Sequence, residues 1–372
     1  MPKMNKGEWG EPYVALRLLA DGRLYMADKN GQKRPDEWMN VVELIRHETA
    51  ERVVKYNRDP ETLMVNIDVN GEPIASLPAS DFTNAADVLS NDIRTGRGTF
   101  EVSEEVSLFF DLAQMVSLKA KSIDKSDIFL TTLDPRSAIT RDNIGFSIKS
   151  KFGHNPTLFN TARASAVRYK IESMTNELAD EINSLVDDKG HAAVTARCRA
   201  LTEAGCHLEY GGYVVAARAK CEAFKENLDV IDPRLPVVIE RILWNHFFEG
   251  NQNVDLDVIV DQIIRDNSCK LTRPEIKYPY MIKSFLYAAY CGMTASTLWD
   301  GTAQVNGGFI TVEENGEILA NYALDSEEFK AYLFNNCYLE FPATSKGHGD
   351  YAKVYERDGE FYFNLNFQIR YR

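Results

Sequence analysis

The sequence lacks a hydrophobic run long enough to cross a membrane. A spanning helix needs about 18 to 20 consecutive apolar residues, and the longest apolar candidate, residues 281–293, is interrupted by Lys283. Residues 1–11 contain lysines with no apolar stretch behind them, so we expect no signal peptide. These absences predict a cytoplasmic protein that has no membrane partner.

The sequence also has little that would build a zinc site or a disulfide framework. Its six cysteines form no Cys-x-x-Cys pair and share no repeated spacing, and its six histidines form no His-Glu-x-x-His motif. Zinc sites depend on spacings of these kinds. We therefore interpret the cysteines as reduced thiols that pack like small hydrophobic residues.

Three common enzyme motifs are absent as well. The sequence has no Gly-x-x-x-x-Gly-Lys-[Ser/Thr] loop, no Gly-x-Ser-x-Gly elbow and no Gly-x-Gly-x-x-Gly turn. These motifs are typical of nucleotide-driven motors, serine hydrolases and dinucleotide-binding folds, respectively. Their absence argues against all three classes.

The composition is that of an ordinary folded protein. The 372 residues are 44% hydrophobic and 26% charged, and this length allows about two domains, or one core with a large insertion. The net charge of −13 disfavours non-specific binding to nucleic acid. Residues 141–171 differ, because they contain six basic residues and one acidic residue. This segment either faces phosphates or forms a solvated surface.

Hydrophobic periodicity predicts an α+β chain in which helices surround a mixed or antiparallel sheet. Expected helices cover residues 8–20, 36–48, 81–94, 104–115, 156–171, 234–249, 254–264 and 278–292. Expected strands cover residues 23–27, 63–69, 72–77, 126–134, 145–150, 309–312, 318–322, 354–357 and 361–368. Residues 172–270 are expected to be mostly helical.

Three polar residues on two adjacent expected strands are candidate catalytic residues. Ser147 and Lys149 alternate with Phe146 and Ile148, so they point to the same face of their strand. Asp127 opens the preceding strand, and pairing of the strands would gather a carboxylate, a hydroxyl and an ammonium. This layout is typical of Mg²⁺-dependent phosphodiester hydrolysis. An exposed hairpin with ordinary polar residues is the alternative.

A second carboxylate has to come from elsewhere. Ser147 stands where such sites usually have another acid, and a hydroxyl cannot replace an anionic metal ligand. Glu8 and Glu11 lie three residues apart, in the first turn of the first expected helix. Asp134 and Asp142 lie near the hairpin turn and are the other candidates. In each case the alternative is an ordinary first-turn or turn acid.

Polar residues beyond the Lys149 strand are candidate DNA contacts. The expected helix 156–171 follows that strand, and its N-terminus would bind phosphate or read base edges close to the site. A capped surface helix there, and a solvated edge strand at the C-terminal end, are the alternatives. A flexible loop at 344–348 and the last strand supply further polar side chains. The candidates are Lys151, Asn155, Thr157, Asn160, Arg163, Lys346, His348, Gln368 and Arg370.

Four sequence blocks resemble the HpaII-type type II restriction endonucleases. They are Asn-Lys-Gly-Glu-Trp-Gly-Glu at 5–11, Gly-Phe-Ser-Ile-Lys-Ser at 145–150, Trp-Asp-Gly at 299–301 and Leu-Asn-Phe-Gln-Ile-Arg-Tyr at 365–371. The blocks occur in the family's order across the chain. The sequence departs from the family at Gly10, where serine is favoured, and at residues 152–155.

The resemblance implies a PD-(D/E)xK nuclease fold, that is, a restriction-endonuclease-like core with a central mixed sheet flanked by helices, plus a helical insertion. We expect residues 1–171 to form the nuclease core with its catalytic hairpin. Residues 172–277 would be a mainly helical region. Residues 278–372 would be a strand-rich region that packs with the core and contacts DNA.

The resemblance also implies an activity and its partners. It implies a bacterial or archaeal, Mg²⁺-dependent type II endonuclease that cleaves duplex DNA at a CCGG-type target and leaves 5′-phosphate ends. A cognate cytosine DNA methyltransferase would protect host DNA, and a homodimer would suit a palindromic target. The alternatives are a non-catalytic DNA-binding protein on the same fold and an acidic scaffold that binds protein and no nucleic acid.

The resemblance assigns roles to the candidate catalytic residues. The family has serine in place of the middle acid, which fits Ser147. Asp127 would be the first metal ligand, and Glu8 or Glu11 the second. Lys149 would stabilise charge and position the attacking water, whereas Ser147 would contact water or phosphate.

Overall fold

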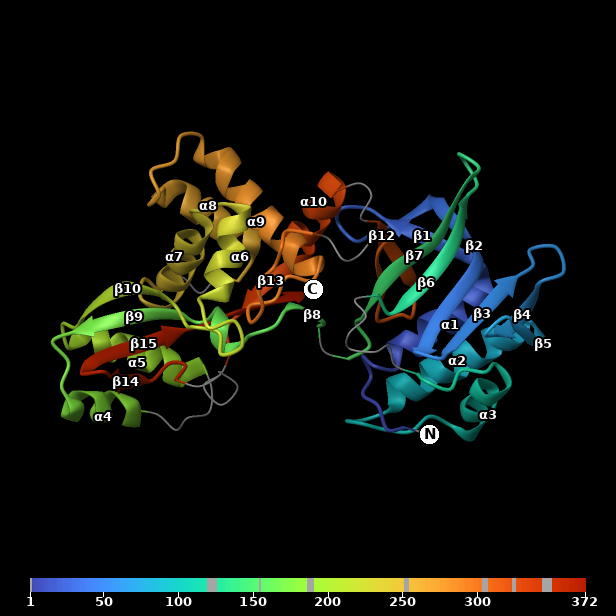
Figure 1. The fold of residues 1–372 in the computed structure, drawn as a ribbon, viewed down its shortest axis with the longest axis horizontal. Coiled ribbons are helices and arrows are strands. Elements are labelled where there is room, and N and C mark those ends of the chain that lie inside the picture. The colour runs from blue at the N-terminus through green and yellow to red at the C-terminus, as the bar shows by residue number, and fades with distance from the viewer. Residues whose placement is uncertain are drawn as a thin grey trace. The chain divides into compact units, whose positions relative to one another are not determined.

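The computed structural model describes residues 2–118, 126–153, 155–185, 191–250, 254–302, 307–322, 326–342 and 350–372. The chain divides into two compact units (Figure 1). The first comprises Met1–Pro156 and Gln304–Tyr332, and the second comprises Thr157–Ala303 and Leu333–Arg372. The chain therefore passes between the units three times. This division differs from the three consecutive segments expected from the sequence, because the second half of the chain contributes strands to the first unit.

A nine-stranded mixed sheet forms the centre of the first unit. Its strand order is β1-β12-β11-β7-β6-β2-β3-β4-β5, and β1 also pairs with β2, so the first six strands in this order form a closed ring. β6 lies between β2 and β7 and is antiparallel to both, whereas β11 is parallel to β7. The strands are β1 (Arg23–Ala27), β2 (Lys33–Thr49), β3 (Arg52–Arg58), β4 (Met64–Val69), β5 (Glu72–Pro78), β6 (Ile128–Asp134), β7 (Ile139–Ser150), β11 (Gly308–Val312) and β12 (Ile318–Tyr322).

Three helices cover the core of the first unit: α1 (Gly10–Asp21), α2 (Ala79–Thr95) and α3 (Glu104–Leu112). α1 packs against α2 and against β7. Phe146 and Ile148 of β7 are buried in this core together with Ile310 of β11. Because strand residues alternate between faces, Ser147 and Lys149 point to the opposite face of β7.

The start of α1 is held in place by the residue that precedes it. The Trp9 side chain is fully buried. Its Nε1–H donates to the Phe100 carbonyl oxygen at 3.2 Å, and its ring stacks on Phe110. Gly22 ends the helix in a left-handed conformation with φ 64°, as the Asp21-Gly22 pair predicts. The buried Trp9 therefore fixes the start of α1 and, with it, the first turn that carries Glu11.

The helix expected over residues 36–48 is wrong, because this segment forms the long strand β2. The register of β2 against β6 shifts between Val41 and Glu43, where one strand contains an extra residue. Met39, Val41 and Leu44 are buried on either side of this irregularity. A bulge changes the two-residue alternation into a spacing of two and then three residues, and that spacing imitates helical periodicity.

The second unit contains two small sheets. Their strand orders are β10-β9-β15-β14 and β13-β16-β8. The strands are β8 (Thr157–Phe159), β9 (Val167–Glu172), β10 (His207–Tyr213), β13 (Cys337–Glu340), β14 (Val354–Arg357), β15 (Glu360–Leu365) and β16 (Gln368–Tyr371). The helices are α4 (Asn176–Ser184), α5 (His191–Glu203), α6 (Ala223–Ile231), α7 (Leu235–Phe247), α8 (Leu256–Asp266) and α9 (Pro274–Tyr290), and α10 (Ser326–Asn336) contains the third passage between the units.

The helix expected over residues 156–171 is also wrong. This segment forms β8, a short 3₁₀ turn (Arg163–Ser165) and β9. Val167, Tyr169 and Ile171 are buried while the residues between them are partly exposed. A two-residue alternation of this kind is typical of a strand with one buried face. The helix N-terminus that was expected to bind DNA at residue 156 therefore does not exist.

The α+β class predicted from the sequence is confirmed by this arrangement of a central mixed sheet with surrounding helices. The expected single strand 361–368 is divided into β15 and β16. Asn366, between them, donates from its side chain to the Ala162 carbonyl oxygen at 2.7 Å. Across the described residues, no helix combines the length and the hydrophobicity required to cross a membrane.

Candidate active site

The β6–β7 pair places Asp127 beside Ser147 and Lys149. Ile128 pairs with Phe146 in the antiparallel register, and the Asp127 N–H donates to the Phe146 carbonyl oxygen at 2.8 Å. The Asp127 side chain then reaches along β7. Its Oδ2 accepts hydrogen bonds from the Ile148 N–H at 2.6 Å and from the Ser147 hydroxyl at 3.1 Å. These bonds fix the orientation of the carboxylate.

A glycine brings the start of α1 to the end of the same strand. A Cβ atom added at Gly10 would lie 2.5 Å from Ser150 Cβ and 2.8 Å from Ser150 Oγ. Real Cβ atoms do not approach so closely, so any side chain at position 10 would displace α1 or Ser150. Because Glu11 follows Gly10 and Lys149 precedes Ser150, this close approach brings a second carboxylate to the catalytic strand.

Lys149 interacts electrostatically with both carboxylates. Burial lowers the pKa of its ammonium group, and the negative charges of Asp127 and Glu11 act in the opposite direction. An ammonium removed from water needs such compensation, because an isolated buried charge is strongly unfavourable. One cation and two anions therefore gather where β6, β7 and α1 meet.

Glu8 occupies a different position from Glu11. The sequence predicts Glu8 in the first turn of the first helix, but the helix begins at Gly10. Glu8 therefore lies in the turn before α1. Its Oε2 accepts the Asn5 N–H at 2.9 Å, while Asn5 Oδ1 accepts the Glu8 N–H at 3.0 Å. These reciprocal bonds shape the turn that leads into the helix.

The two hairpin acids are placed away from Asp127. Asp134 lies at the opposite end of β6 from Asp127, where it pairs with Ile139. Its carboxylate accepts the Arg136 N–H at 2.9 Å. Asp142 is exposed near the start of β7. Glu11 is therefore the second candidate carboxylate that the structure brings near Lys149.

The expected DNA-contact residues are divided between the two units. Lys151 and Asn155 belong to the first unit, whereas Thr157, Asn160, Arg163, Gln368 and Arg370 belong to the second. Thr157 of β8 pairs with Arg370 of β16. Lys346 and His348 lie outside the described residues.

The basic segment 141–171 is not one continuous cationic stripe. It crosses the boundary between the units, and several of its cations already face carboxylates. Lys151 Nζ lies 3.0 Å from Glu313, and Lys170 Nζ lies 2.6 Å from Glu360. Gln368 and Arg370, on the last strand, both donate to Glu340. DNA would have to exchange these partners to bind here.

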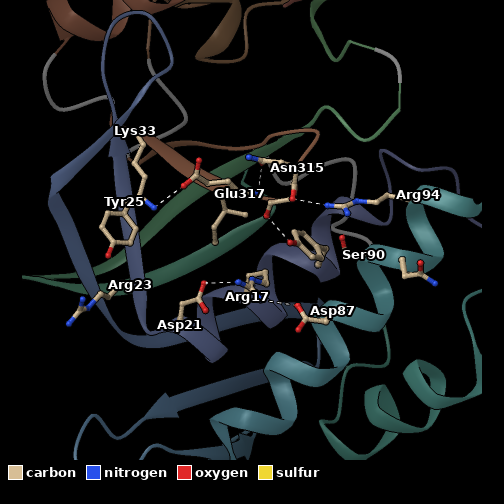
Figure 2. Close-up of a pocket in the computed structure, with 14 residues that line it drawn as sticks. Arg17, Asp21, Arg23, Tyr25, Lys33, Asp87, Ser90, Arg94, Asn315 and Glu317 are labelled. Atoms are coloured by element: carbon tan, nitrogen blue, oxygen red, sulfur yellow. Dashed lines mark hydrogen bonds and ion pairs between the residues drawn. The ribbon is translucent and has the colours of Figure 1, made fainter.

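A separate hollow of about 560 Å³ lies between α1, α2, β1 and the β11–β12 turn (Figure 2). Its charged side chains pair mainly with one another. Arg17 contacts Asp87 at 3.2 Å, Arg94 donates to the Asn315 carbonyl oxygen at 2.7 Å, and Lys33 and Glu317 are 2.8 Å apart. Asp127, Lys149 and Glu11 do not line this hollow. These contacts connect α1 to α2, and α2 and β2 to the β11–β12 turn, so we interpret the hollow as structural.

Within the part of the chain that the structure describes, no group of three or more Asp, Glu, His or Cys side chains is arranged to hold a metal ion. The candidate donors are therefore the two carboxylates of Asp127 and Glu11. Both residues are candidates predicted from the sequence, which also offered Glu8, Asp134 and Asp142 as the second carboxylate. Sequence reasoning missed the Ile148 N–H that orients Asp127, because a backbone donor leaves no mark in a sequence motif.

Comparison with known proteins identifies the family. The sequence model of the HpaII restriction endonuclease family matches residues 5–371. The chain belongs to the HpaII restriction endonuclease family. It is 29% identical over 372 residues to the type II restriction enzyme HpaII of Haemophilus parainfluenzae, covering 99% of this chain and 98% of the relative. No solved structure matches.

Membership of the HpaII family confirms the resemblance and has a direct consequence for the activity. The protein is a type II restriction endonuclease, a site-specific nuclease of a restriction–modification system, and its substrate is duplex DNA. This finding favours an enzyme over the non-catalytic DNA-binding protein that the sequence left open.

Proposed function

We propose that this HpaII-family enzyme is a Mg²⁺-dependent nuclease of the PD-(D/E)xK type that cleaves a CCGG-type target and leaves 5′-phosphate ends. The observation that carries the proposal is the grouping of Asp127, Glu11 and Lys149 where β6, β7 and α1 meet. An aspartate on one strand and a serine-x-lysine pair on the next, within a central mixed sheet, match the pattern expected of that fold.

The two carboxylates suit Mg²⁺ as its protein ligands. Mg²⁺ prefers oxygen donors, keeps several waters, and is usually bound through one or two carboxylates. Both hydrogen bonds to the Asp127 carboxylate end on Oδ2, which leaves Oδ1 to face a cation. Glu11 would supply the second oxygen donor. When bound, the ion would neutralise phosphate charge and lower the pKa of a coordinated water.

Lys149 would stabilise charge in the reaction, and Ser147 would position the Asp127 carboxylate. Lys149 would donate to a non-bridging oxygen of the scissile phosphate and stabilise negative charge as water attacks phosphorus in line and the 3′ oxygen departs. Ser147 would act through Asp127, since its hydroxyl donates to Oδ2 at 3.1 Å. The reaction leaves a 3′-hydroxyl and a 5′-phosphate.

The DNA contacts and the partners are predictions, and the division of the chain into two units indicates which strands would contact DNA. We propose that β8 and β16 of the second unit contribute DNA contacts, since Thr157 and Arg370 are register partners there. A cytosine methyltransferase acting on the same sequence would protect host DNA. A homodimer would present two copies of the site to a palindrome.

We expect discrete fragments when unmethylated phage DNA is digested with the full-length protein and Mg²⁺, and intact DNA when EDTA replaces Mg²⁺. Sequenced fragment ends should share CCGG, and ligase should rejoin them without added kinase because they carry 5′-phosphates. DNA methylated at CCGG cytosines is the control and should stay intact. Fragments that share another sequence would contradict the target, and cleavage in EDTA would contradict metal dependence.

The two glutamates of the N-terminal segment give a matched pair of variants. Glu11→Gln removes the carboxylate near Lys149 and should lower the cleavage rate about 10- to 100-fold at limiting Mg²⁺. Part of this loss should be recovered at high Mg²⁺, because the defect lies in binding the ion. Glu8→Gln keeps an oxygen acceptor for the Asn5 N–H and should cleave like the wild type. The opposite order of effects would reassign the second ligand to Glu8.

A further inference from the structure

Thr311 lies beside Lys149 in the sheet. β11 runs parallel to β7, and Thr311 is the register partner of Lys149. Side chains at paired positions project from the same face, and neighbouring strands are only about 4.8 Å apart. The Thr311 hydroxyl is therefore directed to the face that carries the catalytic lysine.

The Thr311 hydroxyl is buried without a hydrogen-bond partner among the described residues. The residue is 3% exposed, and every position of β11 is buried. A buried hydroxyl with no partner is unfavourable compared with a methyl group of the same shape, because it has lost its hydrogen bonds to water. A purely structural β11 would be served better by valine at this position.

The surroundings of Thr311 narrow the choice of a partner. On the other side, β12 pairs Leu319 with Thr311, and leucine offers no polar group. Along β11, the preceding residue on the same face is Phe309. The next one, Glu313, has its carboxylate in an ion pair. Lys149 has three N–H donors and is therefore the neighbour that a hydroxyl acceptor suits.

We propose that Thr311 is a positioning residue for the nuclease reaction, in which its hydroxyl oxygen accepts a hydrogen bond from Lys149 Nζ when DNA is bound. This contact holds the ammonium toward the scissile phosphate and gives the buried hydroxyl its partner. The proposal rests on the proposed function, in which Lys149 stabilises the charge that develops on the phosphate.

The test compares Thr311→Val with Thr311→Ser in single-turnover cleavage of a CCGG duplex. The valine variant keeps the shape and loses the hydroxyl, so its rate should fall about 10- to 100-fold, as is typical when a supporting partner is removed. The serine variant should cleave at close to the wild-type rate. DNA affinity measured with Ca²⁺ in place of Mg²⁺ should be unchanged in both. The melting temperature of the valine variant should equal or exceed that of the wild type.

The double variant with Lys149→Met separates this proposal from the proposed function. If Thr311 acts through Lys149, adding Thr311→Val to Lys149→Met should cause no further loss of rate. A slow Lys149→Met variant beside a wild-type-like Thr311→Val variant would overturn the role of Thr311 alone. A fully active Lys149→Met variant would overturn the proposed site itself.

Two further outcomes test the proposed role of Thr311. Equal losses of rate and of melting temperature in the valine and serine variants would indicate a packing role and overturn the proposal. Where the valine variant fails to fold, Thr311→Ala against Thr311→Ser gives the same comparison, since these two differ by the hydroxyl alone.

Discussion

Replacing Lys149 with methionine is expected to slow DNA cleavage about 100- to 1000-fold, which is the usual effect of removing one donor that stabilises transition-state charge. Methionine retains most of the apolar stem and removes the ammonium. Binding of DNA in Ca²⁺ should stay close to that of the wild type, because the lysine acts mainly on charge that develops during the reaction. Single-turnover rates and gel-shift affinities measure the two effects separately.

Lys55 provides the control for the loss of a lysine. It lies on β3 of the same sheet, its Nζ is 3.7 Å from Glu43 Oε2, and its side chain is 46% exposed. A partly exposed ion pair of this kind contributes little, so Lys55→Met should leave cleavage unchanged. Equal rates for the Lys149 and Lys55 variants would remove Lys149 from the mechanism.

Replacing Asp127 with asparagine is expected to reduce Mg²⁺-dependent cleavage by about 1000-fold or more. A bound cation contributes several kcal/mol of charge stabilisation, and about 4 kcal/mol corresponds to about a 1000-fold rate change. Asparagine keeps a side-chain oxygen that can accept from the Ile148 N–H and the Ser147 hydroxyl. The variant should therefore keep its fold, so its melting temperature should stay close to that of the wild type while cleavage is lost.

Asp134→Asn is the matched control, because Asp134 is the last residue of β6, whereas Asp127 immediately precedes the first. Its carboxylate shapes the hairpin turn through the Arg136 N–H, and asparagine can accept that bond. This variant should cleave like the wild type. Normal Mg²⁺-dependent cleavage by Asp127→Asn would show that the first metal ligand lies elsewhere.

Local sequence signals were sufficient for the elements that carry the candidate site. The alternation of residues 145–150 predicted that Ser147 and Lys149 share a face, and the antiparallel pairing of β6 with β7 brings Asp127 to them. Each of these features depends on residues close together in the chain.

The features that could not be predicted depend on contacts between distant residues. The register of β11 against β7 joins residues on either side of the whole segment 157–303, so Thr311 looks in the sequence like any strand residue. The approach of Gly10 to Ser150 joins the first helix to β7 in the same way. Spacing alone left Glu8 and Glu11 equivalent, and their difference arises from the residue at which the helix begins.

The path of the chain between the two units determines when the catalytic sheet can be completed during synthesis. β7 emerges from the ribosome before residues 157–303, and its neighbour β11 emerges after them. At roughly 5–20 residues per second, this delay is on the order of ten seconds. Throughout that time one edge of β7 has no strand beside it, and Lys149 lacks its neighbour Thr311. In a nascent chain, the sheet that carries Lys149 is therefore incomplete until β11 has been synthesised.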